Sequence, residues 1–444
     1  MDRSKGLDLS PLHPLLQGMS AYGELVKELG GGVVRAKVVD AAKPFLVAAL
    51  HRELGLPLLL ATAHAEGSKR LYEQLLLWCP DSAQVHLFPE LDVLPYEHLT
   101  PDPATVQERL HILWQLGRSG ADQGLPIIVT SAQALAQKTV SPPDFMARCH
   151  RLEVGMTVNL SRLFSDWLAM GYEMEAAVEV PGTFSRRGGI IDIYPAAGPY
   201  PVRIELLGSR IDSMRNFDPS SQRSLGPVSS VDIMPSREFL IPLKGEGKPA
   251  GTPGGLGGGL DPSGLTPESR MRFQEEMDRL GEGHWFSGME FYAPLFHVGC
   301  LMDYLPPQAL IIFDEPGEIE SSLGELDEQG RGLREQQLAE GVLPPWFPAP
   351  YFSWPELEAR AGVVSRRLIL EQWGADAGDN EIPLVPAPEY GGQWPLLLKD
   401  VRQWLGERSR VLVVSQQAER VSELLEDEDI IAPALSQLGE LPPP

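Results

Sequence analysis

One lysine and two neighbouring acids are the first side chains of this sequence that could do chemistry. Lys43 follows a strand-like run where a phosphate-binding lysine could stand, and Asp314 and Glu315 directly follow the apolar run LIIF. A lysine on phosphate oxygens and an acid on magnesium are the pairing that nucleotide hydrolysis uses. The phosphate loop is missing, however: the run VVDAAKPFLVAAL has no glycine, and Pro44 replaces the required hydroxyl. We therefore predict a relic of a nucleotide site, or a solvated strand end, at Asp314 and Glu315.

A second acidic pair tests a nuclease hypothesis. Asp192 and Glu205 lie on neighbouring predicted strands, like paired carboxylates that hold a catalytic metal. The lysine expected two residues after Glu205 is Leu207, and the surrounding sequence is acidic. A serine hydrolase is excluded as well, because the chain has no G-x-S-x-G motif. We predict no catalytic residue, no metal and no cofactor for this chain.

The charge balance bears on possible partners. The chain has 444 residues, with 61 acidic against 37 Lys and Arg residues and a net charge of −24. A duplex-binding surface needs Lys and Arg to neutralise phosphates, so the chain as a whole should be repelled by DNA. An acidic protein can instead be steered toward a basic surface of a partner protein.

The cysteines bear on the compartment. Cys79, Cys149 and Cys300 are far apart in the sequence and form no C-x-x-C pair, which argues against disulfides and zinc. Cys149 is followed by His150, but adjacent residues rarely ligate one metal. No apolar run is long enough for a membrane span, and the N-terminus has no signal-peptide core. We expect a cytoplasmic protein without membrane contact, and nothing demands more than a monomer.

The elements that would position these side chains alternate between strand and helix over about the first 140 residues. Strands separated by helices predict a parallel sheet covered on both faces. The predicted strands are 33–39, 56–61, 84–87 and 127–129, and the predicted helices are 41–53, 66–78 and 104–116.

The pattern changes further along the chain. One helix at 161–169 is followed by several strands up to about residue 238, which indicates an inserted α+β unit. The segment 251–262 is a linker by composition, and Thr266 and Pro267 begin a helix after it. The strand 310–313 returns to the first sheet. A strand at 368–370, a helix around Trp404, a strand at 410–414 and a helix at 416–425 predict a second, smaller α/β domain.

The most informative stretch is Pro181–Arg223, which begins PGTFSRRGGIIDIYP and continues from Val202 as VRIELLGSRIDSMRNFDPSSQR. Val202, Ile204 and Leu206 alternate with charged residues, as in a strand with one buried and one solvated face. Charged side chains on a rigid sheet suit docking to another protein, so we interpret this unit as a recognition surface.

Three stretches carry a family resemblance: the one just quoted, FPELDVLPYEHLTPDPATVQER at 88–109, and MEFYAPLF at 289–296 with the later IIFDEP. Together they resemble the N-terminal module of bacterial transcription-repair coupling factors, which is itself similar to the repair protein UvrB. The resemblance implies a degenerate, helicase-like parallel-sheet α/β domain over 1–141 and 239–345. It also implies an inserted α+β domain of the UvrA-binding type over 142–238, followed by a small α/β domain of unknown role over 346–444.

The resemblance also suggests binding residues. In UvrB-like proteins the strand that matches 183–187 presents arginines to UvrA, and Arg187 matches one of those positions. Met174 and Ser185 stand where relatives carry arginines, which should weaken pairing with acidic groups. Arg186 could compensate, although strand alternation turns it to the face opposite Arg187. Surface arginines are usually just solvated. The predicted protein-binding residues are Arg187, Arg186, Phe184 and Arg203.

The function that the resemblance implies is recruitment without catalysis: the inserted domain docks UvrA and links stalled RNA polymerase to excision repair. Intact members of the family also contact RNA polymerase, DNA and their own C-terminal half, through domains that this sequence does not contain. Two alternatives stay open, a module that restrains the translocase motor of the same protein and a divergent UvrB-like ATPase.

Overall fold

The computed structural model describes residues 7–79, 84–118, 125–240, 261–372, 380–439 and residue 441. Its largest element is a seven-stranded sheet in which every pair of neighbours is parallel. The strand order is β15-β1-β14-β13-β2-β4-β3. The strands are β1 (Gly32–Lys37), β2 (Leu58–Thr62), β3 (Gln84–Phe88), β4 (Pro126–Ser131), β13 (Leu310–Asp314), β14 (Arg366–Glu371) and β15 (Asn380–Glu381).

Helices cover both faces of this sheet, which explains why its central strands are apolar throughout. Every residue of β2 and β4 is buried. Leu58 and Leu60 of β2 pack into one cluster with α1 (His13–Gln17), α2 (Ser20–Glu28), α3 (Lys43–Leu54) and α4 (Ala65–Trp78). Leu59 and Ala61 pack on the other face with α5 (Pro103–Gly117), α6 (Ala132–Ala136), α7 (Pro142–Met146), α11 (Pro316–Ala339) and α12 (Trp354–Ala361).

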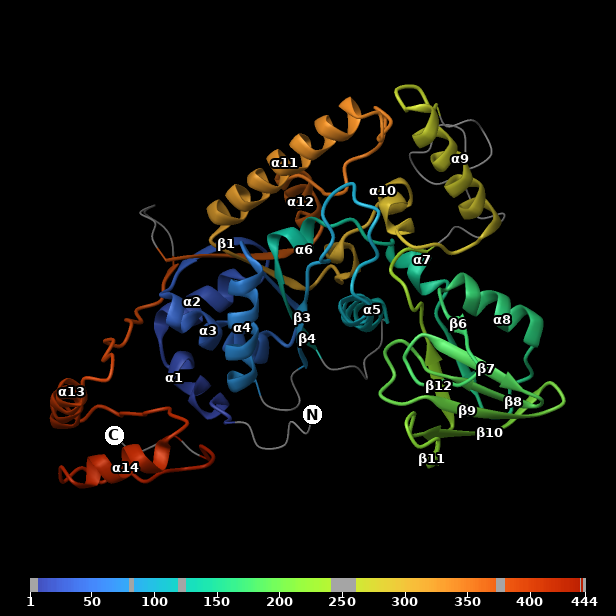
Figure 1. Ribbon diagram of the computed structural model, residues 1–444. Coiled ribbons are helices and arrows are strands. Elements are labelled where there is room, and N and C mark those ends of the chain that lie inside the picture. Colours follow the sequence, from blue (N-terminus) through green and yellow to red (C-terminus); the bar gives the residue numbers. More distant parts are fainter. Residues whose placement is uncertain are drawn as a thin grey trace.

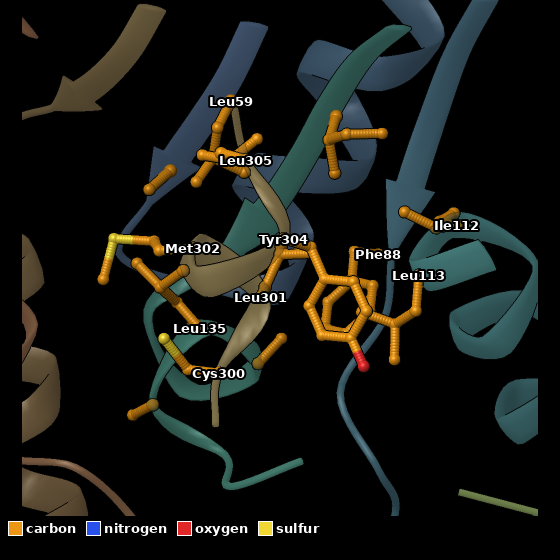
Figure 2. Packing of buried hydrophobic residues seen from close by; sticks show 14 of the residues in the cluster. Leu59, Phe88, Ile112, Leu113, Leu135, Cys300, Leu301, Met302, Tyr304 and Leu305 are labelled. Carbon is orange, nitrogen blue, oxygen red and sulfur yellow. The ribbon is translucent and has the colours of Figure 1, made fainter. Parts of the chain in front are cut away.

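The second of these clusters holds distant parts of the chain together. Figure 2 shows Leu59 of β2, Phe88 of β3 and Leu113 of α5 in this cluster, together with residues of η4 (Leu301–Tyr304). The start of α5 is fixed by its sequence, because Asp102 accepts a hydrogen bond from the Thr105 backbone and Pro103 occupies the first turn. The predicted parallel sheet covered on both faces is therefore confirmed.

The inserted domain contains a six-stranded sheet of order β11-β10-β9-β8-β7-β6, and Figure 1 shows it with α8 (Leu160–Ala169) to one side of the parallel sheet. All its pairs are antiparallel except the short edge pair of β6 with β7. Its strands are β6 (Glu173–Met174), β7 (Thr183–Arg187), β8 (Ile190–Ile193), β9 (Val202–Leu207), β10 (Arg210–Phe217) and β11 (Ser224–Pro227). A two-stranded ribbon of β5 (His150–Glu153) and β12 (Ser230–Ile233) pairs the beginning and the end of the domain.

A third cluster of apolar side chains forms around α9 (Pro267–Glu282), η3 (Met289–Tyr292) and α10 (Ala293–Phe296). Thr266 caps α9, with Pro267 in its first turn, as predicted. The predicted linker falls mostly on residues 251–260, which lie outside the described residues. The aromatic residues of this region pack against each other, with the Phe291 and Phe347 ring centroids 4.7 Å apart. Phe291 and Phe347 are therefore part of the core of this region.

The predicted domain boundary at residue 346 is wrong. β14 lies inside the parallel sheet, between β1 and β13, and β15 extends the same sheet beyond β1. Leu368 and Leu370 of β14 are completely buried in the same cluster as residues of α1, α2, α3 and α4. The segment 366–381 therefore completes the first domain.

The end of the chain also differs from the prediction. Residues 410–414 are described but form no strand, and Leu412 and Val414 are exposed. They connect α13 (Trp394–Gly406) to α14 (Ala418–Glu426), which Figure 1 shows away from the sheets. In the described part of the chain, no helix is long and apolar enough to cross a membrane.

Candidate functional site

The place of a nucleotide site is filled by the protein's own charges. Lys43 begins α3 and has only 3% of its side chain exposed. Its Nζ lies 2.6 Å from Asp314 Oδ1, 2.6 Å from Asp40 Oδ1 and 3.0 Å from Glu315 Oε1. Burial alone would lower the pKa of Lys43, but the neighbouring Asp314 charge outweighs it and the pKa is raised. The ammonium stays charged and paired.

This arrangement corrects one of our two predictions for the acidic pair. Asp314 is not a solvated strand end, because only 14% of its side chain is exposed and it contacts Lys43. Glu315 adopts a left-handed backbone conformation, with φ of 53°, and its Oε1 also accepts the Gln372 backbone N–H at 2.6 Å. The carboxylates around Lys43 therefore form the ion pairs that a phosphate group would otherwise form with this lysine.

The paired carboxylates of the nuclease hypothesis are also neutralised internally. Asp192 accepts two hydrogen bonds from Arg203, at 2.7 and 2.8 Å. Glu205 pairs with Arg215 at 2.7 Å. Among the described residues there is no group of acids, histidines and cysteines that could hold a metal ion. The inserted sheet thus uses both carboxylates to fix its own arginines.

The predicted recognition surface is centred on the β7–β8 hairpin. Its turn contains Gly188, whose positive φ of 64° fits the first central position of a type II′ turn. A Cβ on Gly189 would approach the Leu206 carbonyl oxygen to 3.3 Å, so the second glycine allows β9 to pack closely. The two glycines therefore fix the short turn that follows Arg187.

Arg187 is exposed and lies opposite Ile190 in this hairpin. Its Nη2 donates a hydrogen bond of 2.6 Å to the Ala176 carbonyl, which holds the guanidinium beside the edge strand β6. The remaining N–H groups of the fork leave it able to bind an acidic group of a partner.

Arg186 is exposed too, but it belongs to the other face of the sheet. It lies opposite Ile191, which is 1% exposed, whereas Ile190 opposite Arg187 is 37% exposed. The Arg186 guanidinium lies 5.9 Å from the Phe164 ring centre of α8 and bonds the Gly188 carbonyl. The strand therefore separates the two arginines onto opposite faces, as alternation predicts.

The prediction that Phe184 contacts a partner is wrong. Phe184 is completely buried, and its ring lies 5.2 Å from that of Trp167 and 5.4 Å from that of Phe164. It is a core residue that holds β7 against α8.

Arg203 stays a predicted partner contact, although its guanidinium is already engaged within the domain. Its guanidinium is bidentate on Asp192 and lies 4.6 Å from the Phe217 ring centre, and 21% of its side chain is exposed. The hydrogen bonds that Arg203 donates to Asp192 raise the pKa of Arg203. Arg203 is thus occupied within the domain, which leaves Arg187 as the predicted residue with an accessible guanidinium on this face.

The two expected departures from the family pattern lie in different surroundings. Met174 is 55% exposed on the edge strand, so an arginine there would reach solvent. Ser185 is 3% exposed, in the same row of side chains as Asp192 and Arg203. Sequence reasoning missed Arg215, whose pairing with Glu205 could have been inferred from the charges that β9 and β10 carry.

The residues of the inserted domain define its class. Residues 151–239 match the family model described as the UvrB interaction domain. This range begins in β5, ends at Phe239 and contains the β7–β8 hairpin.

The wider comparison specifies the protein type. The chain is 31% identical over 314 residues to a transcription-repair-coupling factor of Myxococcus xanthus, which covers 68% of this chain and 25% of that protein. It is 27% identical over 314 residues to that of Bacillus subtilis (69% and 26%) and 32% identical over 203 residues to that of Staphylococcus aureus (45% and 17%). The chain is therefore an N-terminal module of the transcription-repair coupling factor type. The matched region spans about a quarter of the length of the first two relatives.

Proposed function

We propose that this chain is a recruitment module that docks the excision-repair protein UvrA through its inserted domain, and that it does so without catalysis. The observation that carries the proposal is the exposed Arg187, held at a rigid glycine turn inside a UvrB interaction domain. Its guanidinium can form charge-assisted, bidentate bonds with a carboxylate on a partner surface.

The absence of catalysis rests on the charge cluster around Lys43. Three carboxylates contact this lysine, so a nucleotide would have to displace them to reach it. A cytoplasmic location is part of the same proposal. The proposal also includes contacts with RNA polymerase, with DNA and with the C-terminal half of an intact protein, and further domains would make these contacts.

Calorimetric titration of the chain with UvrA from the same organism tests recruitment. We expect binding by the parent chain and at least a tenfold loss for Arg187→Glu, because the reversed charge repels an acidic partner. Arg162→Glu is the matched control, since Arg162 is an exposed arginine of the same domain on α8. Far-ultraviolet circular dichroism checks that all three proteins fold.

The outcomes separate the candidate functions. If the parent chain does not bind UvrA, recruitment by this module is refuted and restraint of a motor domain becomes the leading function. If Arg162→Glu weakens binding as much as Arg187→Glu does, the hairpin is not the docking surface. A rise in the unfolding temperature with magnesium and ATP would instead support the divergent ATPase.

A further inference from the structure

A cavity of about 520 Å³ lies where the first domain meets the inserted domain. It is lined by the loop 91–103 before α5, by the residues around β6 and the start of β7, and by the residues of η3 and α10. A volume of this size fits a small organic molecule. None of the residues predicted for UvrA docking lines it.

The walls are largely apolar and aromatic. Phe239, Phe291 and Phe347 are nearly or completely buried and supply ring surfaces. At the rim, Leu94 is 48% exposed and Val180 is 58% exposed, and these two side chains come from different domains. An apolar ligand body would therefore remove exposed hydrophobic surface at the rim as well as filling the interior.

Two buried hydrogen-bond acceptors in the wall lack a partner. His297 is 4% exposed, and one of its ring nitrogens bonds the Lys138 carbonyl. Burial lowers its pKa to about 4, so the ring is neutral and Nε2 is an acceptor. Nε2 and Glu290 Oε2 have no hydrogen-bond partner within the described part of the chain. An unsatisfied buried acceptor is destabilising, so both atoms favour a ligand with N–H donors.

The charges that line the cavity favour a cation. Glu238 is neutralised by Arg109, and Glu173 by Arg237. Lys138 also lines the cavity and adds one positive charge, with its Nζ 5.3 Å from the Phe352 ring centre.

Two glutamates then remain. Glu97 and Glu290 line the cavity, and within the described part of the chain neither forms an ion pair. The described lining therefore has two unpaired carboxylates against one lysine, and its uncompensated charge is negative.

We propose that this cavity binds a small organic cation that combines an apolar, ring-sized body with an amine or guanidinium group. The body packs on the aromatic wall, and the cationic group donates to Glu290 and His297. Because both domains supply the lining, such a ligand also holds the inserted domain against the first domain. This binding is independent of UvrA docking.

Calorimetry and thermal unfolding of the full chain test the proposal with three cations, 4-phenylbutylamine, tryptamine and phenylguanidine. 4-Phenylbutyrate and 4-phenylbutanol are the matched anion and neutral compound. We expect at least one cation to bind and raise the unfolding temperature, and the anion not to bind. Glu290→Gln keeps the shape of the side chain and should weaken cation binding at least tenfold. Glu268→Gln, an exposed position on α9, should leave binding unchanged.

Three results would overturn the proposal. One is the absence of binding by all three cations at millimolar concentration. Another is equal binding of 4-phenylbutylamine and 4-phenylbutyrate, because the charge argument then fails. The third is unchanged cation binding by a folded Glu290→Gln variant, which would move the ligand to another part of the molecule.

Discussion

The Lys43 ammonium of α3 and the Asp314 carboxylate at the end of β13 lie 2.6 Å apart, almost wholly out of solvent. In a nucleotide-hydrolysing protein these two positions would bind phosphate and magnesium. Here they bind each other and connect α3 to the parallel sheet, although 271 positions separate residue 43 from residue 314 in the sequence.

We expect Lys43→Met to destabilise the chain by about 3–5 kcal/mol, because it leaves carboxylates buried without their cation. Urea unfolding measures the loss. Lys37→Met is the control: its partner Glu381 is 3.8 Å away and both side chains are exposed, so the loss should be below about 1 kcal/mol. Equal losses in the two variants would show that the cluster is not a structural clamp.

The Arg109–Glu238 pair should behave in the same way at the junction of the two domains. Arg109 is completely buried, bonds both oxygens of Glu238 at 2.7 and 2.8 Å and donates to the Pro89 carbonyl. We expect Arg109→Met to cost about 3–5 kcal/mol in urea unfolding. Arg151→Met, which removes an exposed arginine, should cost less than about 1 kcal/mol. A small loss for Arg109→Met would contradict this assignment.

Substitutions at the two departures from the family pattern should have opposite effects. Met174→Arg adds an exposed guanidinium on the edge strand β6, beside Phe184 of β7, where the family resemblance places an arginine. We therefore expect stronger UvrA binding and a stability change within about 0.5 kcal/mol. Ser185→Arg forces a charge into a buried position and should destabilise the domain by more than about 2 kcal/mol. Calorimetry and thermal unfolding measure both effects. A Ser185→Arg variant as stable as the parent chain would contradict this prediction, because it would show that the sheet can rearrange to admit an arginine at this buried position.

Phe184 should matter for folding and not for docking. Phe184→Ala removes a ring from the completely buried contact with Trp167 and should cost about 3–5 kcal/mol. Phe184→Leu keeps most of the apolar volume, so a folded variant should bind UvrA within twofold of the parent chain. A larger loss of affinity in folded Phe184→Leu would restore this residue to the docking surface.

Three histidines that are buried or half-buried should make the protein sensitive to mild acid. Burial lowers the pKa of His13, His98 and His297 from 6.5 to about 4. Between these values the unfolded chain binds more protons than the folded chain, so stability falls as the pH drops from 6.5 toward 4. Each histidine contributes at most about 1.4 kcal/mol per pH unit. Urea unfolding at pH 7.5, 6 and 5 measures the slope, and a flat profile would refute the prediction.

The parallel core could be predicted because its strands and helices carry strong local patterns. The runs that form β2, α4 and β13 have the expected apolar spacing, and all three elements lie where the sequence places them. The position of β14 could not be predicted, because an apolar run indicates a strand but not its neighbours in a sheet. Helix α11 was missed because only Ile319 and Leu323 are buried in it, which leaves little periodic signal.

The candidate site was predicted only in part, for reasons of side-chain geometry. Alternation along β7 correctly separated Arg186 from Arg187. The same sequence could not reveal that Arg203 is occupied by Asp192, since that depends on which strands become neighbours. The burial of Phe184 likewise follows from the packing of α8, which lies outside the strand pattern.

The insertion of β14 between β1 and β13 has a consequence for how the chain folds during its synthesis. Gly32 pairs with Arg366, so β1 has no neighbour on that side until the ribosome has made more than 330 further residues. The inserted domain pairs its strands within residues 150–233 and can fold much earlier, as local contacts form fast. For that interval the backbone N–H and C=O groups of β1 have no partner strand at this edge, and once β13 (Leu310–Asp314) has been made its edge also stays open until β14 follows. The nascent first domain is therefore a client for chaperones that bind unpaired strands.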